Sequence, residues 1–240
     1  MRLSWLRGVV AAGMGAAGLA ASPAAARIEH STLADGAEGI YVTGEIALGD
    51  EDRFAALAER YPQAVVYLDS PGGTVVSALE IGKRVRERGY RTVVLADSVC
   101  TSACALIWVA GAPRFLAPGA HLGFHATHMD EGGRLVETGV GNAIVGYYLA
   151  QLSLPEKAAV FATIAPPQDF NWLTAENSGE AGISFESAVQ SLPAPDVALF
   201  NPAAPLQKAG AVAAAVASDV SGKTAPDAEP ALVRKAPKTS

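Results

Sequence analysis

The hydrophobic and polar positions in the first part of the chain follow two alternating periods. Residues 40–46, 64–68 and 92–96 are short runs of β-branched, aromatic and other apolar side chains, which is typical of buried strands. Residues 50–61 and 74–88 instead place apolar side chains at helical spacing, with charged side chains on the opposite side. Repeated strand–helix–strand units predict an α/β fold with parallel strand pairing.

The second part of the domain continues this alternation with shorter elements. A helix starting near Ser102 is apolar on every side, so we expect it to be central. Residues 114–115 and 122–125 are predicted to be short strands. Residues 141–165 are predicted to form either one helix interrupted at Pro155 or two helices in sequence, because proline breaks helical hydrogen bonding.

The two ends of the chain differ in composition from the middle. Residues 1–26 contain two arginines, an uncharged stretch and a run of small residues, which predicts a secretory signal, or an N-terminal membrane anchor if it is not cleaved. From Pro193 onward, Ala and Pro supply 21 of 48 residues, which favours disorder. We therefore predict a signal peptide (1–26), one folded domain (27–190) and a disordered tail (191–240), in a periplasmic or secreted protein.

Charge and composition exclude several functional classes. The formal net charge is −6, and removal of residues 1–26 would change it to −8. An acidic chain of this kind argues against nucleic-acid partners, which require clustered basic side chains. No phosphate-binding glycine–lysine loop occurs, and the sequence implies no cofactor.

Ser102 is a candidate nucleophile because of its place at the start of an apolar helix. A helix N-terminus supplies a positive dipole end and an unpaired N–H group, here that of Ala103, which suits an attacking oxygen. The structural alternative is that Ser102 caps the helix. Thr101 is a second candidate for the cap, which would leave Ser102 free.

A glycine corner, Gly72-Gly73, follows a predicted strand and precedes a predicted helix. Glycines permit backbone conformations that leave N–H groups pointing at a ligand, although such a corner is also an ordinary turn. In the helix that follows, we expect the apolar side chains, Val75 and Val76 included, to point inward.

Three histidines follow the serine in the sequence. His125 closes a predicted strand and is the candidate base, whereas we interpret His121 and His128 as surface or packing residues. His121 and His125 lie on the same side of a strand, but the nearby carboxylates, Asp130 and Glu131, belong to a glycine-bearing loop. The usual set of zinc ligands is therefore missing, and we predict no metal site.

The two cysteines, Cys100 and Cys104, bracket Ser102. In an oxidising compartment a lone pair of cysteines is expected to bond, and a slightly distorted first helical turn would bring their α-carbons to a suitable separation. Such a bond would make the turn that carries Ser102 more rigid. The alternatives are two buried free thiols or a catalytic cysteine, which an oxidising compartment disfavours.

Taken together, these segments resemble the proteolytic subunit of Clp protease and its crotonase-like superfamily over roughly residues 39–187. The resemblance is closest to the secreted or periplasmic Clp-like proteins that carry cysteines beside the serine. It implies a stacked β-β-α spiral fold with Ser102 as nucleophile and His125 as general base. It also implies that the amides of Gly73 and Ala103 form the oxyanion hole. The segments that carry it are Ser70-Pro71-Gly72-Gly73, residues 102–111, residues 114–118 and Phe124-His125.

The third member of the catalytic triad departs from the pattern of that family. The position that aligns with the family's aspartate is Phe170, with Asp169 and Asn171 on either side. We favour Asp169, because a carboxylate stabilises the imidazolium that forms during catalysis. Asn171, or no third member at all, are the alternatives.

The sequence as a whole predicts an exported, ATP-independent serine peptidase-like hydrolase that acts on short or unfolded peptides. We expect no ATPase partner, and we expect a homo-oligomer, for which the apolar residues 141–152 are a candidate interface. One alternative is a non-catalytic module that binds a peptide or an acyl group on the same fold. Another is a crotonase-like enzyme that acts on thioesters through the same paired amides.

Overall fold

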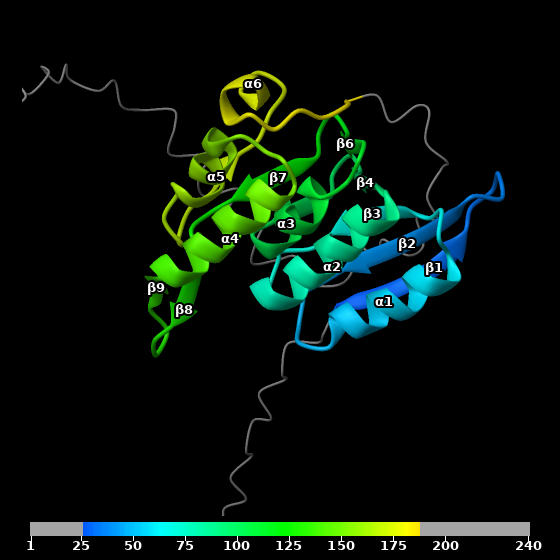
Figure 1. Ribbon diagram of the computed structural model, residues 1–240, viewed down its shortest axis with the longest axis horizontal. Helices are drawn as coiled ribbons and strands as arrows, with labels where there is room; N and C mark the ends of the chain where they lie inside the picture. Colours follow the sequence, from blue (N-terminus) through cyan, green and yellow to red (C-terminus); the bar gives the residue numbers. More distant parts are fainter. Residues whose placement is uncertain (1–25, 188–240) are drawn as a thin grey trace, which may run out of the picture.

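The computed structural model describes residues 26–187, which form a mixed α/β structure built on two sheets and a hairpin (Figure 1). The strands are β1 (Arg27–Thr32), β2 (Glu38–Thr43), β3 (Val65–Asp69), β4 (Arg91–Val94), β5 (Val99–Thr101), β6 (Arg114–Leu116), β7 (His121–Phe124), β8 (His128–Asp130), β9 (Leu135–Glu137) and β10 (Asn171–Trp172). The helices are α1 (Asp50–Arg60), α2 (Val75–Arg88), α3 (Ala103–Val109), α4 (Gly139–Gln151), α5 (Glu156–Thr163) and α6 (Ser178–Ala181).

The larger sheet has five strands in the order β1-β2-β3-β4-β6. Strands β2, β3, β4 and β6 are parallel, and β1 is added antiparallel to β2. The second sheet, β10-β7-β5, pairs β5 with β7 in parallel and β7 with β10 in antiparallel orientation. The predicted α/β fold with parallel pairing is therefore confirmed.

The chain passes from one sheet to the other in a repeated order. Strand β4 of the large sheet leads to β5 of the small sheet and then to α3, and β6 leads in the same way to β7. In the preceding repeat, β3 of the large sheet leads to Ser70, which forms an isolated β-bridge with Cys100 of β5. The chain then continues into α2. This is the stacked β-β-α arrangement that the resemblance implied. Gly73, Ser102 and His125 each follow a strand of this arrangement, and all three line the same pocket.

Helix α3 is at the centre of the structure, as its uniform hydrophobicity predicted. All seven of its residues are buried, and α2 packs beside it. The indole N–H of Trp108 donates to the carbonyl of Phe115 at 2.9 Å, which ties α3 to β6. On the other side, the hydroxyl of Tyr148 in α4 donates to the carbonyl of Leu106 at 3.0 Å. The helix that follows Ser102 is thus fixed from two directions.

The structure refines several of the sequence-based boundaries. The predicted helical stretch 141–165 is two helices, α4 and α5, separated at Pro155, which caps the second. The predicted strand 40–46 ends at Thr43, after which Ile46 makes a separate bridge to Gly73. Val76 is exposed rather than buried, because it lies on the outer face of α2. The sequence does not predict strands β1, β5 and β10 or the β8–β9 hairpin.

The predictions for the two ends of the chain lie largely outside the described residues. The predicted signal peptide ends at the first of them, Ala26, and the predicted tail begins after the last of them. Among residues 26–187, no helix has the length and apolar character needed to cross a bilayer.

Candidate active site

The glycine corner connects β3 to α2 and lies directly against the turn that carries Ser102. An added Cβ at Gly72 would approach the Ser102 Cβ and the Thr101 carbonyl oxygen to 2.7 Å each. Gly72 has φ 99°, which side chains rarely adopt. Both the backbone conformation and the close approach therefore require glycine here.

Gly73 is bridged to Ile46 in a way that leaves its own amide free. The Ile46 amide donates to the Gly72 carbonyl at 2.7 Å, and the Thr74 amide donates to the Ile46 carbonyl at 2.7 Å. In a parallel bridge of this kind, the N–H of the residue between the two bonded neighbours points away from the partner strand. The Gly73 N–H therefore points away from Ile46, and Gly73 lines the pocket beside Ser102.

Ser102 forms a sharp turn between β5 and α3. Its backbone has φ 57° and ψ −125°, a conformation that is strained for a residue with a side chain. Its amide donates to the Gly123 carbonyl of β7 at 2.9 Å. Its side chain makes no capping hydrogen bond, and the Thr101 hydroxyl donates to the Pro71 carbonyl at 3.0 Å instead. The hydroxyl of Ser102 is thus not engaged in capping α3.

The first N–H of α3, that of Ala103, lies beside this hydroxyl. It precedes the first intrahelical acceptor, and no group in residues 26–187 accepts a hydrogen bond from it. Ala103 and Gly73 line the same pocket. Two amides that donate no hydrogen bond within residues 26–187 therefore belong to residues that line the pocket of Ser102.

The predicted disulfide between Cys100 and Cys104 is confirmed. Their α-carbons are 5.2 Å apart, and both residues are fully buried. The bond joins the last strand before Ser102 to the first turn of the helix after it. The strained turn is therefore held covalently at its base.

His125 follows β7 and lines the same pocket as Ser102. Burial lowers the pKa of its imidazole to about 4, and the neighbouring His128 ring acts in the same direction, partly opposed by the backbone of Ala126. His125 is therefore neutral at pH 7. Its Nδ1 atom is buried and has no hydrogen-bond partner. No hydrogen bond within residues 26–187 joins it to the Ser102 hydroxyl.

His128 also lines this pocket, which differs from its interpretation as a surface or packing residue. The centroids of the His125 and His128 rings are 5.2 Å apart, and the Nδ1 atom of His128 is likewise buried without a partner. His121, in contrast, is exposed and contacts Trp172 edge-on. The two histidines that meet are thus His125 and His128.

Neither Asp169 nor Asn171, the two candidates for the third triad member, lines this pocket. The exposed Asp169 accepts a hydrogen bond from the Phe170 amide at 2.7 Å, and Asn171 donates from its side chain to the Phe161 carbonyl at 3.1 Å. The ring of Phe170 contacts His125 edge-on, with centroids 5.0 Å apart. An aromatic ring, rather than a carboxylate, is in contact with the His125 imidazole on this side.

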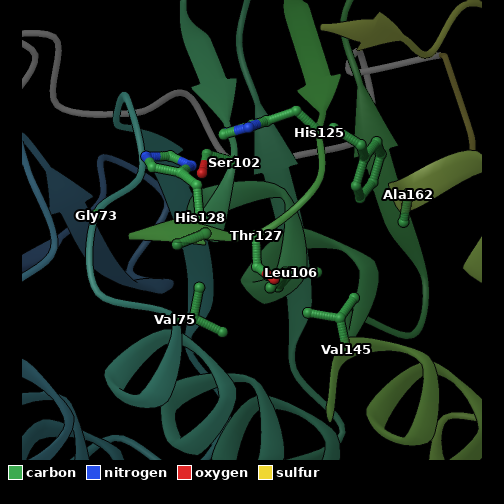
Figure 2. A pocket seen from close by; sticks show the side chains of 11 residues that line it. Gly73, Val75, Ser102, Leu106, His125, Thr127, His128, Val145 and Ala162 are labelled. Atoms are coloured by element: carbon green, nitrogen blue, oxygen red, sulfur yellow. The ribbon is translucent and has the colours of Figure 1, made fainter. Parts of the chain in front are cut away.

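The pocket is polar at Ser102 and apolar on its remaining walls. Figure 2 shows both imidazoles near Ser102, with Val75, Leu106 and Val145 on the opposite side. The cavity is small, with a volume of about 70 Å³, and it is partly open to solvent. Among residues 26–187, no three His, Cys, Asp or Glu side chains are grouped so as to hold a metal ion.

Comparison with known proteins finds similarity to solved structures, but none to a family model or to a curated protein. One similar solved structure is a serine-to-alanine mutant of the 1510-N membrane-bound stomatin-specific protease, with 18% identity, a TM-score of 0.49, and coverage of 62% of this chain and 77% of that one.

Two further solved structures are similar over the same share of the chain. A lysine-to-alanine mutant of the 1510-N protease in complex with a substrate peptide has 19% identity, a TM-score of 0.48, and coverage of 62% and 73%. An asparagine-to-aspartate mutant of ClpP1 from Listeria monocytogenes has 14% identity, a TM-score of 0.46, and coverage of 62% and 90%.

Proposed function

We propose that this protein is an exported serine hydrolase of the peptidase type, with Ser102 as its nucleophile. The observation that carries the proposal is the turn at Ser102, which is strained, closed by a disulfide and directed into a pocket with an uncharged imidazole. A serine that served as a helix cap would make a capping hydrogen bond, and Ser102 makes none.

The proposed chemistry uses the groups around Ser102 in succession. His125 accepts the hydroxyl proton as Oγ attacks a carbonyl carbon, and the amides of Gly73 and Ala103 receive the oxyanion that forms. His125 then returns the proton to the leaving amine, and water hydrolyses the acyl-enzyme by the same route. The low pKa of His125 keeps it in the accepting form at pH 7.

The expected substrates are short or unfolded peptides, without an ATPase partner. The pocket beside Ser102 has apolar walls from Val75, Leu106 and Val145, which favour an apolar substrate side chain next to the cleaved bond. Without an ATPase that unfolds substrates, the enzyme can cleave only chains that are short or already unfolded, because only these can enter the pocket. The proposed export to the periplasm or beyond, where a disulfide persists, fits this restriction.

A non-catalytic binding module is the second candidate. It is favoured by one observation, the absence within residues 26–187 of a hydrogen bond between Ser102 and either imidazole. In that case the free amides of Gly73 and Ala103 would bind the carbonyl of a peptide or an acyl group without cleaving it. A crotonase-like enzyme would use the same amides on a thioester, and affinity for coenzyme A would support that reading.

Digestion of unfolded protein tests the proposal. The purified chain is incubated with a reduced, alkylated protein and with the same protein in its folded form, without ATP. We expect fragments from the unfolded form alone, and none with Ser102→Ala. Binding of the unfolded protein without fragments would instead favour the binding module.

A further inference from the structure

The pocket contains two imidazoles, each with a ring nitrogen that lacks a hydrogen-bond partner. The Nδ1 atoms of His125 and His128 are both buried, and neither has a hydrogen-bond partner. A buried polar atom without a partner costs on the order of 1–3 kcal/mol, so two of them in one pocket require an explanation. Among the residues that line the pocket, no other side chain titrates.

The separation of the two rings is that of a hydrogen-bonded pair. Two imidazoles joined by an N–H···N hydrogen bond of about 3 Å have centroids about 5 Å apart, because each nitrogen lies about 1 Å from its ring centre. The observed distance is 5.2 Å, with the rings tilted by 32°. The two rings are therefore as close as a hydrogen bond between their nitrogens requires.

Local backbone contacts explain how residues three apart come together. Strand β7 ends at Phe124, and the chain turns before β8 starts at His128. The turn is fixed by Thr127, whose amide donates to the Asn142 side chain at 2.8 Å and whose hydroxyl donates to the Thr138 carbonyl at 3.1 Å. His128 is thereby placed beside His125 by the hydrogen bonds that its neighbour Thr127 donates to α4 and to the cap of α4.

We propose that His128 is the third member of the site, a positioning residue whose Nδ1 accepts a hydrogen bond from the Nδ1–H of His125. This inference deepens the proposed function and rests on it for the roles of Ser102 and His125. The bond fixes the His125 tautomer, so that its Nε2 carries the lone pair that faces the serine. His128 thus does for His125 what a carboxylate does in other triads.

In this arrangement, the proton that leaves Ser102 can be followed through every step of the reaction. The Ser102 Oγ–H proton moves to Nε2 of His125, which becomes an imidazolium while its Nδ1–H stays bonded to the neutral Nδ1 of His128. When the amine leaves, the same proton moves from Nε2 to the amine nitrogen, and His125 is neutral again. A neutral acceptor stabilises the imidazolium less than a carboxylate does, so a moderate rate of catalysis is expected.

Matched substitutions separate His128 from Asp169. His128→Phe keeps a ring and removes the acceptor, whereas His128→Gln keeps an acceptor oxygen. We expect the labelling rate of Ser102 by a fluorophosphonate probe to fall about 100-fold in the first variant and about 10-fold or less in the second, the scale of acid–base contributions. Asp169→Asn is expected to change it less than about 2-fold. A 100-fold loss in Asp169→Asn, with a normal rate in His128→Phe, would overturn the proposal.

Nitrogen NMR of the histidines provides a readout that does not require activity. At pH 7 we expect His125 in the Nδ1–H tautomer and His128 in the Nε2–H tautomer, with the His125 tautomer lost in His128→Phe and retained in His128→Gln. If these tautomers are found but no probe reacts, the pair stands and the hydrolase proposal fails. If His125 carries its proton on Nε2 in the unmodified protein, the pair itself is refuted.

Discussion

At the scale of single residues, the site depends on contacts between backbone segments that meet at Ser102. Gly72 lies against the Ser102 turn, Thr101 bonds to Pro71, and the Ser102 amide bonds to Gly123. The strained serine is therefore held by its neighbours on three sides. A strained residue of this kind persists only where the surrounding structure imposes it.

Replacement of Gly72 tests this contact directly. Gly72→Ala adds a Cβ within 2.7 Å of backbone and side-chain atoms at positive φ, so we expect the free energy of unfolding to fall by about 2–5 kcal/mol. Gly119→Ala is the matched control, because Gly119 also has positive φ (85°) but open space around it. It is expected to cost about 1–2 kcal/mol. Equal losses in the two variants, measured by urea denaturation, would contradict the close approach.

Some residues of the candidate site can be predicted from the sequence and others cannot. Ser102, His125, Gly73 and Ala103 are predicted as a group, because a strand end, a helix start and a glycine corner can each be recognised from a few neighbouring residues. His128 is not, since its approach to His125 depends on a turn fixed by Asn142, far along the chain. The spacing of three residues would even place the two side chains on opposite faces of a continuous strand.

At the scale of elements, the disulfide closes the β5–Ser102–α3 turn. A bond across a loop this short removes about 2 kcal/mol of unfolded-state entropy. We expect the double variant Cys100→Ala, Cys104→Ala to unfold roughly 4–8 °C lower than the native chain. Calorimetry with and without a reductant measures this difference, and the reductant should lower the melting temperature of the native chain but not that of the double variant. If neither the substitutions nor the reductant changes the melting temperature, the disulfide does not form in solution.

The elements themselves were predicted unevenly. Helices α1 and α2 were placed almost to the residue, because their apolar spacing extends over several turns. Strand β5 has three residues and β10 has two, so neither provides a period long enough to recognise. Val76 follows Val75 in sequence but points to solvent, because on a helix neighbouring residues do not face the same side.

At the scale of the whole molecule, helices α4 and α5 expose an apolar face. Val140, Ile144 and Tyr147 of α4 are 74%, 48% and 67% exposed, and Val160 of α5 and Ile164, the residue that ends α5, are also exposed. Helix α4 contains no charged residue. This face is where we expect the proposed homo-oligomer to form.

Light scattering coupled to size-exclusion chromatography tests the proposed assembly. The native chain is expected to elute with a mass that is a multiple of the monomer, and the variant Ile144→Glu, Tyr147→Glu as a monomer. Val76→Glu is the control, because Val76 is also exposed but lies on α2, and it should leave the mass unchanged. A native chain that elutes as a monomer would refute this interface.

The stability of the whole molecule should also report on His125. Its pKa is about 4 in the folded state, against about 6.5 when exposed, so the unfolded chain binds more protons between these pH values. The free energy of unfolding therefore falls as the pH is lowered from 6.5 to 4, by about 2 kcal/mol after allowance for the solvent that reaches the ring. In His125→Gln this part of the decrease should be absent. Parallel pH dependences of the two proteins in urea denaturation would show that the imidazole titrates normally.

Labelling with a fluorophosphonate probe decides whether Ser102 is a nucleophile, because the probe reacts with an activated serine and not with one that only caps a helix. We expect one phosphonyl adduct per chain, located at Ser102 by peptide mass spectrometry, and none in Ser102→Ala or His125→Ala. If the folded native chain acquires no adduct, or acquires it at another residue, Ser102 is not the nucleophile.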